Sequence, residues 1–417
     1  MANHKAKNWQ RLDANTGKES PQGRLFAGPA LVDLSAVRVV WAGVDTIRQL
    51  YRGILKADIL ERLEEDSERG DVLWPSPLAL MWHVSRAPWG SGYTYKLQNN
   101  EWGAVVLIKS FYAKAEQEGA HLKIELSPHM ISQRGARQIQ QQLDHIAAHF
   151  FGEGRYKYGG CAPHLAADIQ GWDIRSDFME KFLTRSRTVR NYNGISKVQF
   201  DLSEVSSTYG DNETVMFGKA NALQFTTYRK DKEIQRSDKV DFMRREWECY
   251  SMGIYDDSKP VRRFEARFHH SVVAEIGEGI GEELLSFSQV AEHLTDLWRY
   301  ALQRNRLDYS SQYIDPFWQL LRDDVQFYHP ANGLWIRRVK KESVQPVGRN
   351  YSQIIGNLVT VAARMGWKTA QLMKELKKLS FFDDILRWYS LRGWNEGMLR
   401  QELERSLLSR RLMGKAA

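Results

Sequence analysis

Reactive side chains gather in three short segments in the middle of the chain, residues 162–169, 222–229 and 261–270. Each segment alternates apolar with polar residues, and this alternation predicts a β-strand that buries one face. If the three strands are neighbours, their polar faces form one continuous surface. The side chains on that surface would include His164, Asp168, Tyr228, Arg263, Glu265, Arg267 and His269.

This set of side chains is suited to an oxygen-preferring divalent cation, because carboxylates and imidazoles are common ligands for such ions. A second interpretation needs no ion. Water usually covers a polar strand face, and Asp168 is then a solvated carboxylate while Glu265 pairs with an arginine across the sheet. The residues alone leave both interpretations open.

Two motifs carry a more specific signal. Residues 162–168 read Ala-Pro-His-Leu-Ala-Ala-Asp and are similar to a strand of the form R-x-D-x-x-x-D, with His164 at the first acidic position and Ala162 in place of the arginine. Residues 228–233 read Tyr-Arg-Lys-Asp-Lys-Glu and are similar to Y-D-K-x-x-E, with Arg229 in place of the acidic residue.

A third motif, R-x-E, follows at Arg263-Phe264-Glu265. In this order, over about residues 90–300, the three motifs resemble those of the replication initiation factor family. That family contains the trans-acting rolling-circle initiators of plasmids and filamentous phages, together with relaxases of some integrative elements. The resemblance implies that a tyrosine attacks a DNA phosphodiester, which gives a 5′-phosphotyrosyl link and a free 3′-OH that primes replication.

The resemblance implies Tyr228 as the nucleophile and Lys230 as the cation that neutralises charge on the phosphate. Tyr209, Tyr250 and Tyr255 are the competing tyrosines. It also implies a divalent metal, Mg²⁺ or Mn²⁺, which would polarise the scissile phosphate. The implied metal ligands are Asp168, Glu265 and His164, and the arginines expected to bind flanking phosphates are Arg263 and Arg267.

Strands and helices alternate around these motifs. The pattern predicts an α+β fold in which an antiparallel-type sheet carries helices packed on one face, and the resemblance implies the duplicated fold of replication initiators. Helical spacing of apolar residues predicts a helix over residues 46–65, and residues 92–109 predict a hairpin. We expect an N-terminal arm over residues 1–45 and a nicking domain over residues 46–310.

The chain has a net charge of +8, and its positive excess lies entirely in the last fifth of the sequence. Residues 331–417 contain 17 Lys/Arg and 7 Asp/Glu, whereas the other 330 residues contain 42 basic and 44 acidic side chains. This asymmetry predicts a basic, all-helical region over residues 311–417 that binds DNA, although a solvated basic helix surface would look the same. Gly366 before a helix at Thr369 is typical of a helix-turn-helix, and the cations expected at DNA are Lys368, Lys374, Lys377 and Lys378.

Other features of the chain exclude several classes of protein. Cys161 and Cys249 are far apart, which argues against a disulfide framework or a zinc ribbon and indicates a cytoplasmic location. No segment approaches the roughly 20 apolar residues that cross a bilayer, so no membrane partner is expected. The glycines of residues 276–281 lack the ending of an ATPase phosphate loop, so a host helicase is expected to open the duplex.

We therefore expect a rolling-circle initiator that nicks and joins single- or double-stranded origin DNA. Three alternatives remain. A relaxase of a mobile element would use the same chemistry at a transfer origin. A non-catalytic regulator on the same fold would bind an origin without forming a covalent adduct. A nuclease that uses its carboxylates to activate water would cut DNA without Tyr228.

Overall fold

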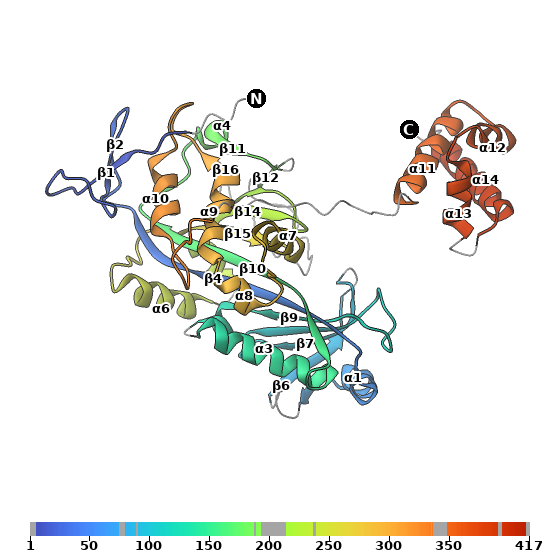
Figure 1. Ribbon diagram of the computed structural model, residues 1–417, viewed down its shortest axis with the longest axis horizontal. Coiled ribbons are helices and arrows are strands. Elements are labelled where there is room, and N and C mark those ends of the chain that lie inside the picture. Colours follow the sequence, from blue (N-terminus) through green and yellow to red (C-terminus); the bar gives the residue numbers. More distant parts are fainter. Residues whose placement is uncertain are drawn as a thin grey trace. The chain divides into compact units, whose positions relative to one another are not determined.

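The computed structural model describes residues 6–74, 80–88, 91–132, 134–186, 189–192, 214–236, 239–334, 336, 348–390 and 394–413. The chain divides into two compact units, Met1–Val339 and Lys340–Ala417. The first unit combines a large sheet with helices, and the second is helical (Figure 1).

The first unit is built on an eleven-stranded sheet whose neighbouring strands are all antiparallel. Two long strands at its centre, β4 (Arg38–Gly53) and β10 (Tyr156–Gln170), pair along their length. The other strands are β5 (Asp71–Leu73), β6 (Met81–Arg86), β7 (Tyr93–Asn99), β8 (Ala104–Ser110), β9 (Gly119–Leu126), β12 (Val189–Tyr192), β13 (Thr214–Phe217), β14 (Leu223–Arg229) and β15 (Arg262–Phe268). The predicted antiparallel sheet and the predicted hairpin, β7–β8, are confirmed.

The strand order is nearly symmetric about the central pair. From β10 the sheet continues outward through β15, β14, β13 and β12, and from β4 it continues through β9, β8, β7, β6 and the short edge strand β5, which has no counterpart in the other half. In each half the chain leaves the long strand, reaches the edge and returns to the centre. Each half then ends in a helix, α3 (Ala136–Phe151) after β9 and α7 (His270–Ile280) after β15. The two halves therefore have a similar strand order.

One face of the sheet carries the main hydrophobic core, and it is the face that the alternation predicts. Leu165, Ala167 and Ile169 of β10 lie in this core with Phe264 and Phe268 of β15. The helices that contribute buried side chains to it include α3, α7, α8 (Phe287–Ala291), α9 (Leu294–Arg304) and α10 (Pro316–Asp324). Fully burying one large apolar side chain stabilises a fold by about 1.5–3 kcal/mol, so this face dominates the stability of the unit.

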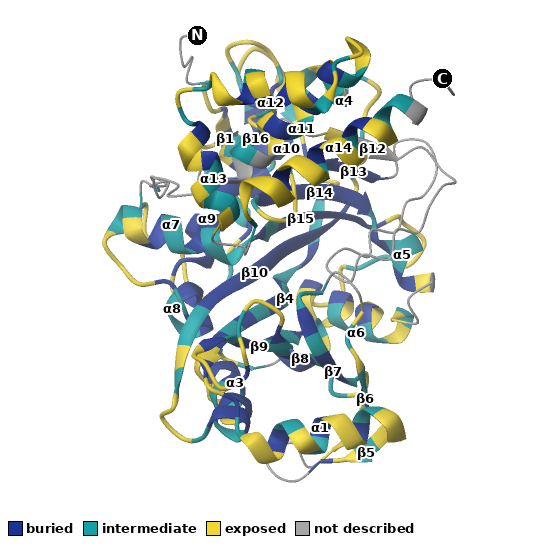
Figure 2. Ribbon diagram, turned by 90° about the vertical axis from the view of Figure 1, so that its right-hand side faces the viewer, coloured by how far each residue is buried: buried dark blue, intermediate teal, exposed yellow. Residues whose placement is uncertain are grey.

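Helices also cover part of the opposite face, so the prediction of helices on one face only is wrong. Figure 2 shows α5 (Lys230–Arg236) and α6 (Val240–Ser251) across β10 from α7, α8 and α9. Met243 and Trp247 of α6 pack in a second cluster with Trp41 and Ala166 from the sheet. These two α6 residues are four positions apart and so share one side of the helix, which must be covered.

The N-terminal segment is part of the folded unit and not an arm. Strands β1 (Gln10–Leu12), β2 (Leu25–Ala27) and β3 (Leu31–Asp33) form a small sheet. Trp9 and Phe26 are buried in the main core. The helix predicted over residues 46–65 is wrong in its first part, because β4 runs to Gly53 and α1 spans Ala57–Arg69.

The first unit extends past the boundary predicted at residue 310. Helix α10 buries Phe317, Trp318 and Leu321 in the main core, so it cannot belong to a separate region. The remaining short elements of this unit are α2 (Pro128–Ile131), α4 (Phe178–Lys181), β11 (Phe182–Thr184) and β16 (Asn305–Leu307).

The second unit consists of α11 (Gly348–Arg364), α12 (Thr369–Lys377), α13 (Phe382–Ser390) and α14 (Glu396–Met413), which confirms its predicted helical character. It has its own core, with Val359, Leu372 and Leu403 buried. Gly366 has φ +71° and closes the turn between α11 and α12, a conformation that glycine adopts easily. Among the described helices of the chain, none combines the length and apolar character that crossing a membrane requires.

Candidate functional site

The three strands that carry the motifs are neighbours, in the order β14-β15-β10. Their register places Tyr228 opposite Arg263, and Arg263 opposite Asp168. His164 lies opposite Arg267. Directly paired residues of antiparallel strands project to the same face, so the reactive side chains share one face of the sheet, as the alternation predicts.

Glu265 is the centre of this site. Its Oε2 accepts a hydrogen bond from the Tyr228 hydroxyl at 3.2 Å. Arg267 donates from Nε to Oε1 at 2.9 Å and from Nη2 to Oε2 at 3.0 Å. His164 Nδ1 lies 3.6 Å from Oε1. A buried carboxylate that a guanidinium fixes in place and that contacts a tyrosine hydroxyl is positioned to accept the phenolic proton.

Tyr228 is a buried neutral phenol. Burial, followed by the charge of Glu265, raises its pKa well above the ordinary value. The hydroxyl is therefore protonated at neutral pH and needs a base before it can act as a nucleophile. Glu265 accepts a hydrogen bond from this hydroxyl, so its carboxylate is within reach to remove the phenolic proton.

Lys230 stands beside the tyrosine because β14 ends at Arg229 and α5 begins at the next residue. Its Nζ lies 5.9 Å from the centroid of the Tyr228 ring and forms an ion pair with Glu233. Residues three apart share one side of a helix, which gives a structural reason for the Lys-x-x-Glu spacing of the second motif.

Asp168 and Arg263 form a buried ion pair. Arg263 donates from Nε to Asp168 Oδ1 at 2.6 Å and from Nη2 to Oδ2 at 2.7 Å. Trp247 Nε1 donates to Oδ2 at 2.8 Å, and Asp45 pairs with the remaining end of the guanidinium. Burial alone would lower the pKa of Arg263. The negative charges of Asp168 and Asp45 together have the larger effect, so the pKa of Arg263 lies well above its ordinary value.

The prediction that Arg263 binds DNA phosphates is therefore wrong, because its side chain is fully buried and its guanidinium is held by two carboxylates. Arg267 is 14% exposed and lines a surface pocket, so its contact with DNA stays a prediction.

The predicted metal ligands do not fit a metal centre in this arrangement. Both oxygens of Asp168 accept bonds from Arg263, and both oxygens of Glu265 accept bonds from Arg267. Each carboxylate thus already faces a cation. Within the described part of the chain, no group of three or more His, Cys, Asp or Glu side chains is arranged to hold a metal ion. We derive no chemical step through a metal.

Sequence reasoning missed Asp45, Trp41 and Trp247, which complete the surroundings of Arg263. The register skips Asp45 between the pairs His164–Thr46 and Leu165–Val44, so Asp45 occupies a bulge in β4. A bulge reverses the alternation and re-aims a side chain, which hides such a residue from a period-two pattern. The guanidinium of Arg263 lies 5.0 Å from the centroid of the Trp41 ring.

The competing tyrosines have different surroundings. Tyr250 is 43% exposed on α6. Tyr255 packs its ring against Trp247, with the ring centroids 5.2 Å apart. Tyr209 lies outside the described residues.

Three buried or half-buried histidines predict that the protein loses stability in mild acid. Burial, assisted by nearby positive charges, lowers the pKa of His149 and of His270 to about 4, and lowers the pKa of His164 well below its ordinary value. The unfolded chain titrates these groups near ~6.5, so it binds more protons than the folded protein between about pH 6.5 and pH 4. Stability is therefore complete above that window and is lost as the pH falls through it.

We expect the free energy of unfolding, measured with urea, to fall by up to about 2 kcal/mol for each of these histidines between pH 7.5 and pH 5. The variant His270→Gln should show a smaller decrease over the same interval. A free energy of unfolding that does not change with pH would show that these imidazoles titrate normally in the folded protein.

The predicted DNA-binding lysines of the second unit are exposed. Lys368 precedes α12, and Lys374 lies on it. Lys377 Nζ lies 2.6 Å from Glu396 and Lys378 Nζ lies 2.7 Å from Glu375. Exposed ion pairs of this kind contribute only about 0–1 kcal/mol, so a DNA phosphate can compete for these lysines.

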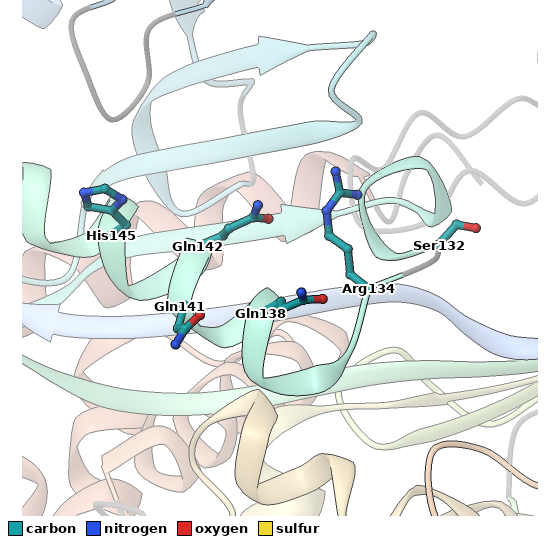
Figure 3. A pocket seen from close by; sticks show the side chains of 6 residues that line it. All are labelled: Ser132, Arg134, Gln138, Gln141, Gln142 and His145. Atoms are coloured by element: carbon teal, nitrogen blue, oxygen red, sulfur yellow. The ribbon is translucent and has the colours of Figure 1, made fainter.

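A separate surface groove of about 480 Å³ follows α3 in the first unit. Half of its side chains are amides, and the side chains do not converge on one point (Figure 3). The groove is lined by Ser132, Arg134, Gln138, Gln141, Gln142 and His145. It contains neither the tyrosine nor the carboxylates of the three motifs, so we do not assign the chemistry to it.

Comparison with known proteins adds one finding. No family model matches the chain. The chain is 33% identical over 409 residues to a phage protein described as uncharacterized protein ORF430 of Pseudomonas phage Pf1, and the match covers 93% of this chain and 92% of that protein. A match of this extent includes most of each unit. The chain therefore belongs to the same protein family as ORF430 of Pseudomonas phage Pf1.

Proposed function

We propose that this protein is a rolling-circle replication initiator that nicks and rejoins one strand of origin DNA through a 5′-phosphotyrosine. The observation that carries the proposal is the hydrogen bond between Tyr228 and Glu265, on a face where three segments that resemble motifs of the replication initiation factor family meet. The similar strand order in the two halves of the sheet supports the duplicated fold that the same resemblance implies. Membership in a family with a phage protein is compatible with a role in phage replication.

The geometry suggests how the chain would perform the first step. Glu265 removes the phenolic proton as the Tyr228 oxygen forms a bond to the scissile phosphorus. The bond from phosphorus to the 3′-oxygen breaks, and that oxygen takes a proton from water to become the 3′-OH. Arg267 keeps Glu265 oriented, and Lys230 offsets negative charge near the tyrosine oxygen. The reverse reaction would rejoin the strand and release Tyr228.

A covalent adduct is the direct test of this proposal. The full chain is incubated with a fluorescent single-stranded origin oligonucleotide in buffers with and without Mg²⁺ or Mn²⁺, and denatured with SDS. We expect a labelled protein band when the label is at the 3′ end of the oligonucleotide, because the tyrosine keeps the fragment that carries the 5′-phosphate of the break. A label at the 5′ end should leave with the fragment that ends in the free 3′-OH. Cleavage without any adduct would favour hydrolysis by water, and binding without cleavage would favour the regulator.

The second unit supplies the positive charge that duplex binding would use. Residues 340–417 contain 15 Lys/Arg and 7 Asp/Glu, a net charge of +8, which equals the net charge of the whole chain. The first unit is therefore electrically neutral overall. The second unit has a hydrophobic core of its own, so removal of residues 340–417 leaves the main core of the first unit intact.

We expect deletion of residues 340–417 to weaken binding to duplex origin DNA by at least tenfold while adduct formation on a short single strand persists. The logarithm of the association constant falls with the logarithm of salt concentration by about 0.9 for each phosphate contact on duplex DNA. The truncated protein should therefore show a shallower salt dependence, measured by fluorescence anisotropy from 50 to 300 mM NaCl (roughly the range over which such contacts are resolved). Equal slopes for both proteins would place duplex binding in the first unit.

A further inference from the structure

A pocket of about 390 Å³ opens on the same sheet face as Tyr228 and Glu265. It spans the junction between the two halves of the sheet. Arg48 of β4 and Lys123 of β9 come from the first half, and His164 of β10, Gln224 of β14 and Arg267 of β15 come from the second half. His164 and Arg267 also contact Glu265, so the pocket is continuous with the proposed catalytic site.

The side chains around this pocket favour an anion. The lining contains the cations of Arg48, Lys123 and Arg267 and three imidazoles, but neither aspartate nor glutamate. Arg48 and Lys123 contact Glu125 at 3.3 Å and 2.6 Å, and Arg267 contacts Glu265. A DNA phosphodiester is an anion that such a lining would attract.

Two tyrosines stand at the same pocket. Tyr93 is buried, with 7% of its surface exposed, whereas Tyr112 is 90% exposed. An exposed aromatic ring beside a phosphate site is the usual arrangement for stacking a nucleobase of a single strand. A buried tyrosine cannot serve this purpose, so Tyr112 is the residue that would stack.

We propose that this pocket binds one internal nucleotide of the single DNA strand, with its phosphodiester against Lys123 and Arg48 and its base on Tyr112. The assignment rests on the proposed function and goes beyond it, because it gives the first half of the sheet a function of its own. The second half contains the nucleophile Tyr228, and the first half binds the DNA strand next to it.

The test measures equilibrium binding in the Tyr228→Phe background, so that no covalent chemistry interferes. The probe is a fluorescent ten-nucleotide oligothymidylate, and the variants are Lys123→Gln and Tyr112→Ala. The matched control is Lys157→Gln, which also removes a lysine paired with a glutamate but lies seven residues from His164 along β10, about 23 Å away. We expect each pocket variant to weaken binding roughly tenfold and the control to leave it unchanged.

Two further measurements separate the possible outcomes. Lys123→Gln should reduce the salt dependence by about 0.7, the value for one contact on a single strand, and Tyr112→Ala should leave the slope unchanged. The dinucleotide TpT should compete with the probe better than the monoester dTMP. Wild-type affinity in both variants would overturn the proposal, since removal of the exposed Tyr112 ring is not expected to affect folding. Stronger competition by dTMP would also overturn it in favour of a free-nucleotide site.

Failure of the proposed function gives a different result. If wild-type Tyr228 protein forms no adduct but Lys123→Gln and Tyr112→Ala still lose affinity, the pocket binds a strand and the protein is a regulator. If the adduct forms normally and both variants bind like the parent, the nicking function stands and the pocket assignment is wrong.

Discussion

Replacement of Tyr228 by phenylalanine should abolish the covalent protein–DNA adduct, with a loss of roughly 10⁴-fold or more in the rate of strand cleavage. The substitution removes only the oxygen that donates to Glu265, and the ring keeps its place on β14. Binding of single-stranded DNA should therefore change by less than about twofold. Adduct yield is measured by SDS gel electrophoresis, and binding is measured by anisotropy on the same oligonucleotide.

Two companion variants make this result specific. Tyr250→Phe removes the hydroxyl of an exposed tyrosine on α6 and should leave the adduct unchanged. Glu265→Gln keeps a polar side chain of the same shape but removes the base, and loss of a general base typically costs about 10²–10⁴-fold. An adduct that persists in Tyr228→Phe would move the nucleophile elsewhere, with Tyr209 as the next candidate.

The three motif strands could be predicted from the sequence because each has a strict period of two. Leu165, Ala167 and Ile169 are buried in the main core, and this fixes His164 and Asp168 on the other face. A one-residue shift would expose the whole apolar set, so the register follows from burial. The sequence could not show which of the polar residues water would reach.

The burial of Asp168 depends on a helix that is distant in sequence. Trp247 of α6 donates a hydrogen bond to the carboxylate, and Met243 of the same helix packs in the cluster beside it. Period-two alternation within β10 contains no information on that contact. For this reason Asp168 was predicted to be a metal ligand or a solvated carboxylate, whereas it is a buried partner of Arg263.

Two local patterns were misleading for a different reason. The glycines of residues 276–281 suggest a turn, but Gly277 and Gly279 lie inside α7. Gly277 is required by packing, because a Cβ there would lie 2.6 Å from the carbonyl oxygen of Glu282. The middle of β4 is interrupted by a bulge at Asp45, so its alternation is not continuous and the sequence pattern indicates part arm and part helix. Alternation also predicts a strand over residues 197–202, which lie outside the described residues.

Replacement of Arg263 by methionine should destabilise the first unit by about 3–5 kcal/mol, because it leaves two carboxylates in the interior without their shared cation. Asp168 is fully buried and would keep only the bond from Trp247 among those described here. The double variant Arg263→Met, Asp168→Asn removes one of the uncompensated charges and should recover part of the loss. Urea unfolding at pH 7.5 measures the free energy for each protein.

The control for this experiment is an ion pair on the surface. Arg69 pairs with Glu65 on α1 with both side chains more than two-thirds exposed, and Arg69→Met should change the free energy of unfolding by less than about 1 kcal/mol. If Arg263→Met also changes the free energy of unfolding by less than about 1 kcal/mol, the Asp168 carboxylate must be hydrated or protonated in the variant. Water would then reach the space beneath α6 more readily than its contacts indicate. A large loss would instead establish that the ion pair between Arg263 and Asp168 stabilises the pairing of β15 with β10.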